Sequence, residues 1–172
     1  EGKMLALVKY GTGPRETELR EVPVPEIGDD DLLIEVKAAG ICGSDIAYDN
    51  GDHPNHLNCP VVLGHEFSGV VSKVGKNVTE WKVGDRVVSD NTGYVCGKCH
   101  ACTTGQYLMC PERLGLGYGM DGGFTDYVKI RGDLLSRNPN ALFHIPDNVS
   151  FDEAAILDPI CNAYKAVVQE SS

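Results

Sequence analysis

Short apolar runs separated by turns dominate the first 150 residues of the chain. In residues 31–39 every second side chain from Leu32 to Ala38 is apolar, which is the period of a strand with one buried face. Similar runs predict strands at residues 4–10, 66–74, 85–89 and 124–130. The 20 glycines and nine prolines supply the turns between them, so we expect a mainly β domain over residues 1–150.

The pattern changes to helical at the end of the chain. Ser150-Phe151-Asp152-Glu153 matches a capping box, in which the Ser and Glu side chains satisfy free amide groups at a helix start. Helix is expected over residues 153–157, and Pro159 suits the first turn of a second helix running to about Gln169. Residues 151–172 therefore form a predicted helical segment, and we expect further protein to follow it.

Charge and hydropathy narrow the class of protein. The net charge of −10 repels phosphate backbones and the cations form no basic stripe, which argues against nucleic-acid binding. No apolar stretch approaches the ~20 residues of a membrane span, and no secretory leader is visible. We expect a cytoplasmic protein without a membrane partner.

The seven cysteines are distributed unevenly, with four of them between residues 96 and 110. Crowded thiols at Cys-x-x-Cys spacing present sulfur atoms at the separation needed by tetrahedral zinc, whose Zn–S bonds are ~2.3 Å. Cys96, Cys99, Cys102 and Cys110 are therefore predicted to hold a structural zinc in a lobe spanning residues 93–115. An iron–sulfur cluster and four unrelated free thiols are the alternatives. His100 lies inside a complete quartet and is expected to be solvated.

A second possible metal site lies upstream, in two separate segments. Cys42-Gly43-Ser44-Asp45 offers a thiolate, and Gly64-His65-Glu66 offers an imidazole and a carboxylate. Mixed sites of this kind usually leave one position for water or substrate, as catalytic zinc requires. Spacing alone makes this signal weak, because a His–Glu pair is more often structural.

Several motifs together resemble one family. Residues 64–71 (GHEFSGVV), the following Val74-Gly75 and Gly84-Asp85-Arg86-Val87, the Cys42 segment and the four-cysteine lobe occur in the order shown by zinc-dependent medium-chain dehydrogenases/reductases. The resemblance covers essentially the whole chain, and within the family it is nearest to sorbitol, other polyol and threonine dehydrogenases. It implies a GroES-like, partly open β-barrel with a zinc-binding lobe and C-terminal helices.

The resemblance also implies a catalytic zinc. Cys42 and His65 would be ligands, and Glu66 a ligand that exchanges with water or substrate. Asp158 occupies the position of a Glu-Pro in sorbitol dehydrogenases and an Asp-Pro in threonine dehydrogenases, which would bring it near the metal. The other interpretation of Asp158 is a cap for the helix beginning at Pro159.

Two further roles follow from the same resemblance. Ser44 would hydrogen-bond the substrate hydroxyl and accept its proton, while zinc stabilises the alkoxide. Asp45 would bind the free nitrogen of His65 and fix its tautomer, although a helix N-terminal cap is an equally good interpretation.

The chain departs from the family pattern at the expected proton relay. Some alcohol and polyol dehydrogenases carry a His soon after the Cys-Gly-Ser-Asp segment, where this chain has Ala47 and Tyr48. His53 and His56 are the substitutes nearby. Three other residues match no ligand position: Cys59 and Cys161 are expected to be buried thiols, and His144 a packed histidine.

No dinucleotide-binding turn is present. Gly115-x-Gly117-x-Gly119 has the wrong spacing for a Gly-x-Gly-x-x-Gly turn and precedes no predicted helix. The resemblance places the nucleotide-binding domain, and with it the choice of NAD or NADP, beyond residue 172. We therefore expect the chain alone to turn over poorly.

The predicted function is zinc-dependent, NAD(P)-linked oxidation of a secondary alcohol (a polyol, sugar alcohol or threonine-like compound) to a ketone. The expected partner is a small-molecule alcohol, and the parent enzyme is expected to be a homo-oligomer. The alternative is a non-catalytic, zinc-stabilised GroES-like module with a structural or interaction role. Such a module has no need of an open Cys/His/carboxylate site.

Overall fold

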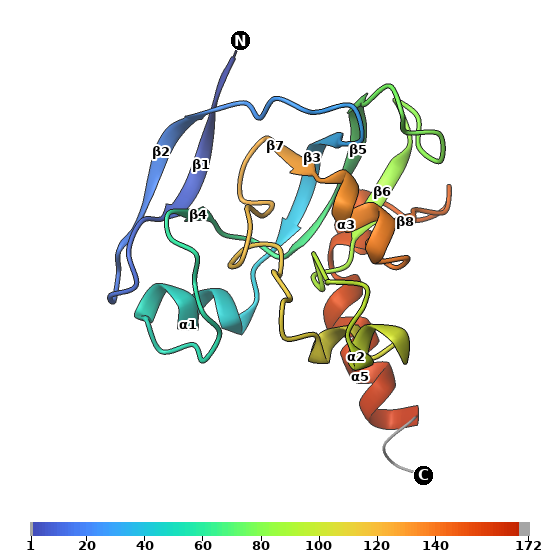
Figure 1. Ribbon diagram of the computed structural model, residues 1–172. Helices are drawn as coiled ribbons and strands as arrows, with labels where there is room; N and C mark the ends of the chain where they lie inside the picture. Colours follow the sequence, from blue (N-terminus) through green and yellow to red (C-terminus); the bar gives the residue numbers. More distant parts are fainter. Residues whose placement is uncertain (1, 169–172) are drawn as a thin grey trace.

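Two antiparallel sheets form the body of the protein, which a computed structural model describes over residues 2–168 (Figure 1). The smaller sheet has the order β2-β1-β4 and consists of β1 (Lys3–Lys9), β2 (Thr17–Pro23) and β4 (Val61–Val62). The larger has the order β7-β3-β5-β6-β8 and consists of β3 (Leu32–Gly40), β5 (Glu66–Val74), β6 (Arg86–Ser89), β7 (Tyr127–Ile130) and β8 (Leu142–His144). The prediction of a mainly β fold is confirmed.

The sheets approach each other without closing into a continuous barrel. An isolated bridge joins Ala6 of β1 to Thr125, just before β7, and Leu7 donates its amide to the carbonyl of Phe124 at 2.9 Å. β1 also pairs with β4 on its other side. The expected partly open arrangement is therefore observed.

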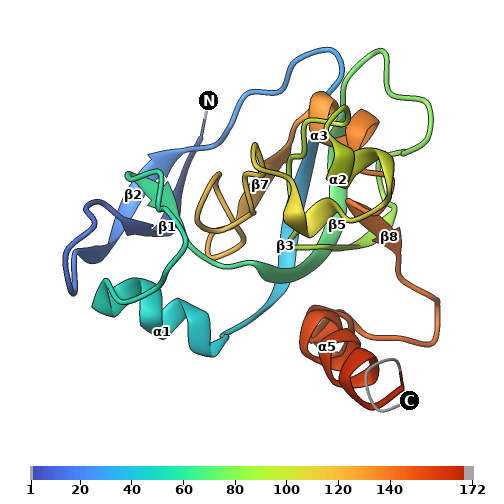
Figure 2. The ribbon, with the colours of Figure 1, turned by 60° about the horizontal axis from the view of Figure 1, so that its bottom comes forward.

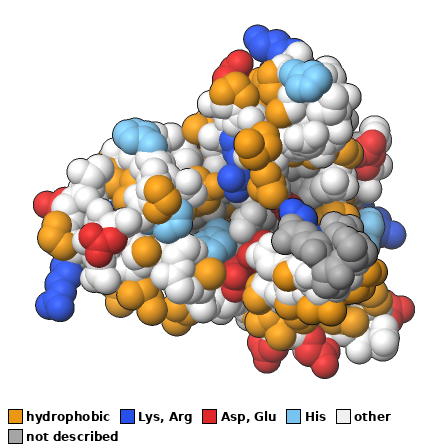
Figure 3. Space-filling model, turned by 90° about the horizontal axis from the view of Figure 1, so that it is seen from below, with side chains coloured by type: hydrophobic (Ala, Val, Ile, Leu, Met, Phe, Trp, Pro, Cys, Tyr) orange, Lys and Arg blue, Asp and Glu red, His pale blue; other side chains and the backbone are white. Residues whose placement is uncertain are grey.

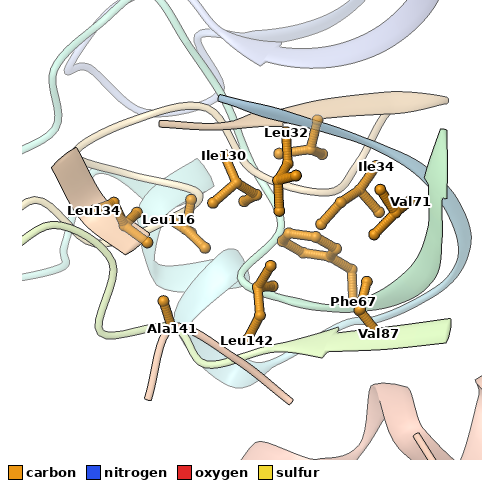
Figure 4. Close-up of a cluster of buried hydrophobic side chains, with 11 residues drawn as sticks. Leu32, Ile34, Phe67, Val71, Val87, Leu116, Ile130, Leu134, Ala141 and Leu142 are labelled. Carbon is orange, nitrogen blue, oxygen red and sulfur yellow. The ribbon is translucent and has the colours of Figure 1, made fainter. Parts of the chain in front are cut away.

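The main core lies against the larger sheet (Figure 4). Phe67 of β5 packs among aliphatic side chains from β3, β6 and β7, and the cluster extends to Leu134 and Leu142. Burial in β3 is less regular than strict alternation, because Leu33 is buried as well as Leu32 and Ile34. The ladder between β3 and β5 also shifts register twice, between Leu33 and Ile34 and between Val36 and Ala38.

Six short helices complete the described residues. They are α1 (Gly43–Asn50), α2 (His100–Thr103), the 3-10 helix η1 (Tyr107–Met109), α3 (Gly132–Arg137), α4 (Phe151–Ala155) and α5 (Leu157–Val168). Three parts of the chain lie at one end of the sheets: α1, the lobe around α2, and α5. Figure 2 shows that they are separate from one another. None of the helices in residues 2–168 has both the length and the apolar character needed to cross a membrane.

The predicted capping box is present at α4. Ser150 Oγ accepts from the amide of Glu153 at 3.2 Å, and Glu153 Oε2 accepts from the amide of Ser150 at 2.8 Å. The second helix begins at Leu157, two residues before Pro159, so Asp158 lies in its first turn and is not its cap. Its predicted end at Gln169 lies outside the described residues.

The histidines and cysteines that match no ligand position lie as follows. His100 is exposed, as expected. His144 is exposed too, but its ring stacks on that of Trp81, with ring centroids 4.4 Å apart. Cys59 is half-buried, and burial raises the pKa of its thiol. The prediction of a buried Cys161 is wrong: it is exposed, because no residue of α5 is buried in the described part of the chain.

Candidate metal centres

The four thiols of the lobe converge on one point. One sulfur from each of Cys96, Cys99, Cys102 and Cys110 lies within 4.8 Å of the others, and Cys96 Sγ and Cys102 Sγ are 3.9 Å apart. Tetrahedral zinc with ~2.3 Å bonds places its sulfurs roughly 3.8 Å apart. The amide of Cys99 donates to Cys96 Sγ at 3.3 Å, and that of Cys96 donates to Cys110 Sγ at 3.4 Å. The residues present therefore fit a zinc ion.

Electrostatics inside the lobe agree with a metal-binding role. Backbone N–H groups of Lys98 and Cys99, together with the neighbouring thiols, lower the pKa of Cys96 to about 7, although burial opposes them. Burial raises the pKa of Cys102 to about 12. A bound cation favours the thiolate form of such groups, so zinc and a buried thiol suit each other. Four sulfur donors leave no position for substrate, which makes this centre structural.

A second group of donors forms where β3 ends and β5 begins. Gly40, the last residue of β3, pairs with Glu66, the first residue of β5, so the segments leaving both strands meet there. Cys42 follows β3 as the N-terminal cap residue of α1. One donor atom from each of Cys42, His65 and Glu66 lies within 4.8 Å of the others. The sheet register thus assembles the predicted site.

Gly64 permits the turn that orients His65. Its φ is +95°, a left-handed conformation that side chains other than glycine rarely adopt. A Cβ built on Gly64 would lie 2.7 Å from the backbone nitrogen and ring atoms of Phe124. The Gly-His-Glu motif therefore depends on the glycine as well as on the ligands.

The two ring nitrogens of His65 face different partners. Nε2 lies 3.9 Å from Glu66 Oε1 and 3.2 Å from Ser44 Oγ, while Nδ1 lies 3.3 Å from Asp45 Oδ1. Both Nδ1 and Oδ1 are buried without another hydrogen-bond partner among the described residues. Asp45 Oδ2 accepts from the amide of Cys42 at 2.8 Å. Asp45 is therefore the third residue of α1 and completes its capping box, whereas the N-cap itself is Cys42; its other oxygen faces the ring, and its role in fixing the His65 tautomer stays a prediction.

This centre gathers several acidic groups around one buried imidazole. Burial lowers the pKa of His65, but the Asp45 carboxylate and the Cys42 thiol outweigh burial and raise it to about 9. Burial, reinforced by the charge of Asp158, raises the pKa of Glu66. A dication bound by these three donors would relieve the crowding of acidic groups, and the thiolate–imidazole–carboxylate set is one that zinc accepts.

Asp158 lies near this centre but outside the three-donor group. Its Oδ1 accepts from Asn91 Nδ2 at 3.1 Å, and its Oδ2 accepts from Asn162 Nδ2 at 3.3 Å. Burial raises its pKa, and the charge of His65 opposes that rise. Its proposed contact with the metal stays a prediction.

A polar and aromatic network beside the centre was not predicted. Arg113 donates to the carbonyl of Thr92 at 3.0 Å and to that of Asn91 at 3.4 Å. Its guanidinium carbon lies 5.7 Å from the ring centroid of Tyr118, which stacks on Tyr48 of α1 at 5.4 Å. The sequence offers one signal only, namely that Arg113 closely follows the last cysteine of the lobe.

Figure 3 views this end of the molecule directly. Histidine, acidic and basic side chains meet around a hollow between the lobe, the α1 region and α5. The structure thus places both donor groups and the unpredicted network on the same side of the sheets.

Comparison with known proteins agrees with the geometry. Residues 28–140 match the alcohol dehydrogenase GroES-like domain, which confirms the expected fold. The chain is 45% identical over 172 residues to the uncharacterized zinc-type alcohol dehydrogenase-like protein YdjL of Escherichia coli K12, covering 98% of this chain and 48% of that one. It is 41% identical to D-arabitol-phosphate dehydrogenase of Enterococcus avium and 40% identical to sorbitol dehydrogenase of Halalkalibacterium halodurans. Each of these matches covers 98% of this chain and 46% of the relative.

A solved structure has a similar fold. The fold superimposes with a TM-score of 0.81, at 30% identity, on a protein from E. coli CFT073 described as a short chain alcohol dehydrogenase complexed with NADH, covering 97% of this chain and 45% of that one. The chain spans about half the length of the curated relatives it matches. On the domain match, the chain belongs to the alcohol dehydrogenase GroES-like domain family, and the relatives that it matches include a zinc-type alcohol dehydrogenase-like protein and two polyol dehydrogenases.

Proposed function

We propose that this chain provides the zinc-binding and alcohol-binding half of an enzyme that oxidises the secondary alcohol of a polyol to a ketone. The observation that supports the proposal best is the buried group of Cys42, His65 and Glu66, with Ser44 and Asp45 both in contact with His65. A structural module would need the lobe but not this second, three-donor centre.

The chemistry divides between groups that the chain would bind and groups that it carries. Zinc supplies Lewis acidity, which lowers the pKa of an alcohol oxygen, and NAD or NADP supplies the hydride acceptor. Ser44 Oγ lies beside the Nε2 face of His65, which is the face that Glu66 shares. In the proposed reaction, Ser44 Oγ accepts the proton of a substrate hydroxyl and gives up its own to solvent, while the hydrogen on carbon leaves as hydride to the nicotinamide.

Asp45 keeps the imidazole in the form that the centre needs. A neutral ring that carries its proton on Nδ1, facing Asp45 Oδ1, leaves the Nε2 lone pair free for a metal ion. The same carboxylate holds the amide of Cys42, so both ligands are oriented by a single side chain. Asp45 is therefore a positioning residue.

The substrate class follows from the relatives and from the polar surroundings of the centre. D-arabitol phosphate and sorbitol, which name two of the relatives, are extended polyols. A threonine-like alcohol is the other candidate, suggested by the Asp158-Pro159 dipeptide. The names of these relatives favour the polyol, and the carboxylate of Asp158 can accept a hydrogen bond from one of its hydroxyls.

Cobalt substitution tests the alcohol-binding role. The chain loaded with Co²⁺ should show thiolate-to-cobalt absorption from both centres, and sorbitol should change only the contribution that Cys42→Ser removes. A spectrum that is insensitive to sorbitol, threonine and simple secondary alcohols would argue for the non-catalytic module.

A companion measurement concerns turnover. The one Gly-x-Gly-x-x-Gly pattern in the sequence, from Gly117 to Gly122, follows the zinc lobe and opens no helix, unlike a dinucleotide-binding turn. We therefore expect little or no NADH formation from NAD and sorbitol by this chain alone. Rapid NADH formation by the isolated chain would contradict the proposal that this chain binds zinc and alcohol but not the cofactor.

A further inference from the structure

A cavity of about 580 Å³ lies where the two sheets separate. Beyond the bridge between Ala6 and Thr125, β1 and β7 belong to different sheets and do not pair. Met4 of β1 and its partner Val22 of β2 line the cavity on one side, and β7 lines it on the other. The volume lies within the roughly 300–1,000 Å³ of small-molecule sites in proteins.

The outer edge of β7 faces this cavity. Tyr127, Val128 and Lys129 are consecutive and all line it, although successive side chains of a strand point to opposite faces. Val36 of β3 donates its amide to the carbonyl of Asp126 at 2.8 Å. The alternation of an antiparallel ladder then turns the amides of residues 127 and 129 away from β3. Neither amide has an acceptor elsewhere in the described chain, so both can donate to a ligand.

The charge around the cavity is positive, although the protein is acidic. Three of its 18 lining residues are basic, namely Arg20, Lys129 and Arg131. The one acidic residue, Asp121, accepts from the amide of Val62 at 2.9 Å. Arg20 and Arg131 each pair with a carboxylate, whereas Lys129 has no ion pair among residues 2–168. One unpaired cation suits a head group with a single negative charge.

Most of the remaining lining is apolar. Ten of the 18 residues are valine, proline or methionine. Val22 and Met120 are only half-buried, so they retain apolar surface that a ligand can cover. A molecule that matches this cavity therefore combines an apolar chain with a small anionic end.

We propose that this cavity binds a free medium-chain fatty acid. The carboxylate accepts from the Lys129 ammonium and from a free amide on the β7 edge, and the alkyl chain covers Val22 and Met120. The cavity shares no lining residue with the Cys42 group or with the lobe of residues 93–115. The inference is therefore independent of the proposed function.

The matched ligands for a test are decanoate and decanol, which have the same alkyl chain and differ in charge. Each is titrated, below the concentration at which it aggregates, into the zinc-loaded 172-residue chain and followed by NMR chemical shifts. Decanoate should bind about tenfold more tightly than decanol, as expected for a charge-assisted contact, and should shift the amide signals of Tyr127 and Lys129. Octanoate should bind roughly tenfold more weakly than decanoate, because it buries two fewer CH₂ groups.

Two variants separate the charge from the apolar contact. Lys129→Gln removes an unpaired cation from an edge strand, so it should keep the fold and abolish the preference for decanoate while decanol binding stays unchanged. Val22→Thr places a hydroxyl where the alkyl chain lies and should weaken both ligands alike. Lys37→Gln, at an exposed position of β3 outside the cavity, is the control and should keep the preference.

The pattern of shifted signals distinguishes this cavity from the exposed apolar face of α5. Ile160 and Tyr164 of that helix are both exposed and offer a competing surface for an alkyl chain. Decanoate that shifts the amides of residues 157–168 and not those of β7 would overturn the proposal. Equal affinities for decanoate and decanol, a preference retained in Lys129→Gln, or no binding of decanoate would overturn it as well.

Discussion

At the scale of single residues, Asp45 is the side chain on which the second centre most depends. Asp45→Asn keeps an oxygen that can accept from the Cys42 amide but removes the charge facing His65 Nδ1. We expect zinc affinity at this centre to fall by about 10- to 100-fold, the usual effect of losing a partner of a metal-bound histidine. Competition with a chromophoric chelator measures the change.

The lobe provides the internal control for that experiment. Its four ligands come from Cys96 to Cys110, and Asp45 is not among them. Its zinc affinity should therefore be the same in Asp45→Asn and in the original chain. Equal loss of zinc from both centres would indicate general unfolding. No loss from either centre would show that Asp45 does not position His65 for zinc.

The pH dependence of zinc binding gives a second residue-scale prediction. The pKa of His65 is raised to about 9, so below that pH the ring must lose a proton before Nε2 can bind zinc. Affinity at this centre should therefore rise as pH increases from 6 to 9, by about tenfold per unit for each proton displaced. In Asp45→Asn the His65 pKa should fall, and the slope between pH 7 and 9 should decrease by about one proton. An unchanged slope would contradict the Asp45–His65 contact.

The sequence predicted the donors better than their surroundings. Cys96, Cys42 and His65 lie in short motifs whose chemistry is local, so spacing and family resemblance were enough to find them. The contact of Arg113 with Asn91, and of Asn91 with Asp158, depends on how the lobe packs against α5, and no local pattern encodes that packing.

At the scale of elements, the turn before β5 is the most restrictive. Gly64→Ala would combine a positive φ with a contact of 2.7 Å to Phe124, whereas Gly84→Ala would have a similar φ of +94° and nothing within 4 Å. Backbone strain alone should cost Gly84→Ala about 1 kcal/mol of unfolding free energy, and Gly64→Ala about 3 kcal/mol or more. Urea denaturation measures both variants, and equal losses would contradict the close approach of Gly64 to Phe124.

The zinc lobe should behave as a separate element. Its buried cluster consists of Val95 and three of the cysteines, and shares no residue with the main core. Cys102→Ser should therefore lose one zinc per chain and expose the amides of residues 93–115 to hydrogen exchange. Amides of β3 and β5 should keep their protection, and their simultaneous loss would show that the lobe supports the whole fold.

Which elements could be predicted follows from how much apolar surface each one buries. β5 was predicted with its observed bounds, because most of its side chains are buried. β2 was missed, since it lies at a sheet edge with no fully buried residue, and β4 contains only two residues. α1 was expected only as a possible cap at Asp45, because its few apolar positions do not repeat with a helical period.

At the scale of the whole molecule, the two sheets bring distant segments to one end. Cys42 and Glu66 meet because β3 and β5 pair along their length, and Asp158 arrives there through α4, which packs against both strands. The lobe lies beside them (Figure 3), and Arg113, which closely follows its last cysteine, donates to the carbonyl of Thr92. In the proposed account, this arrangement separates a centre that would stabilise the fold, in the lobe, from the three-donor centre that would leave a position for substrate.

The most direct test of the account is the zinc content of the purified chain, measured by mass spectrometry of the metal after extensive dialysis. We predict two zinc ions per chain, falling to one in Cys42→Ser and, independently, to one in Cys102→Ser. A single zinc in the original chain, or two zincs retained in Cys42→Ser, would contradict the catalytic centre and leave only a zinc-stabilised structural domain.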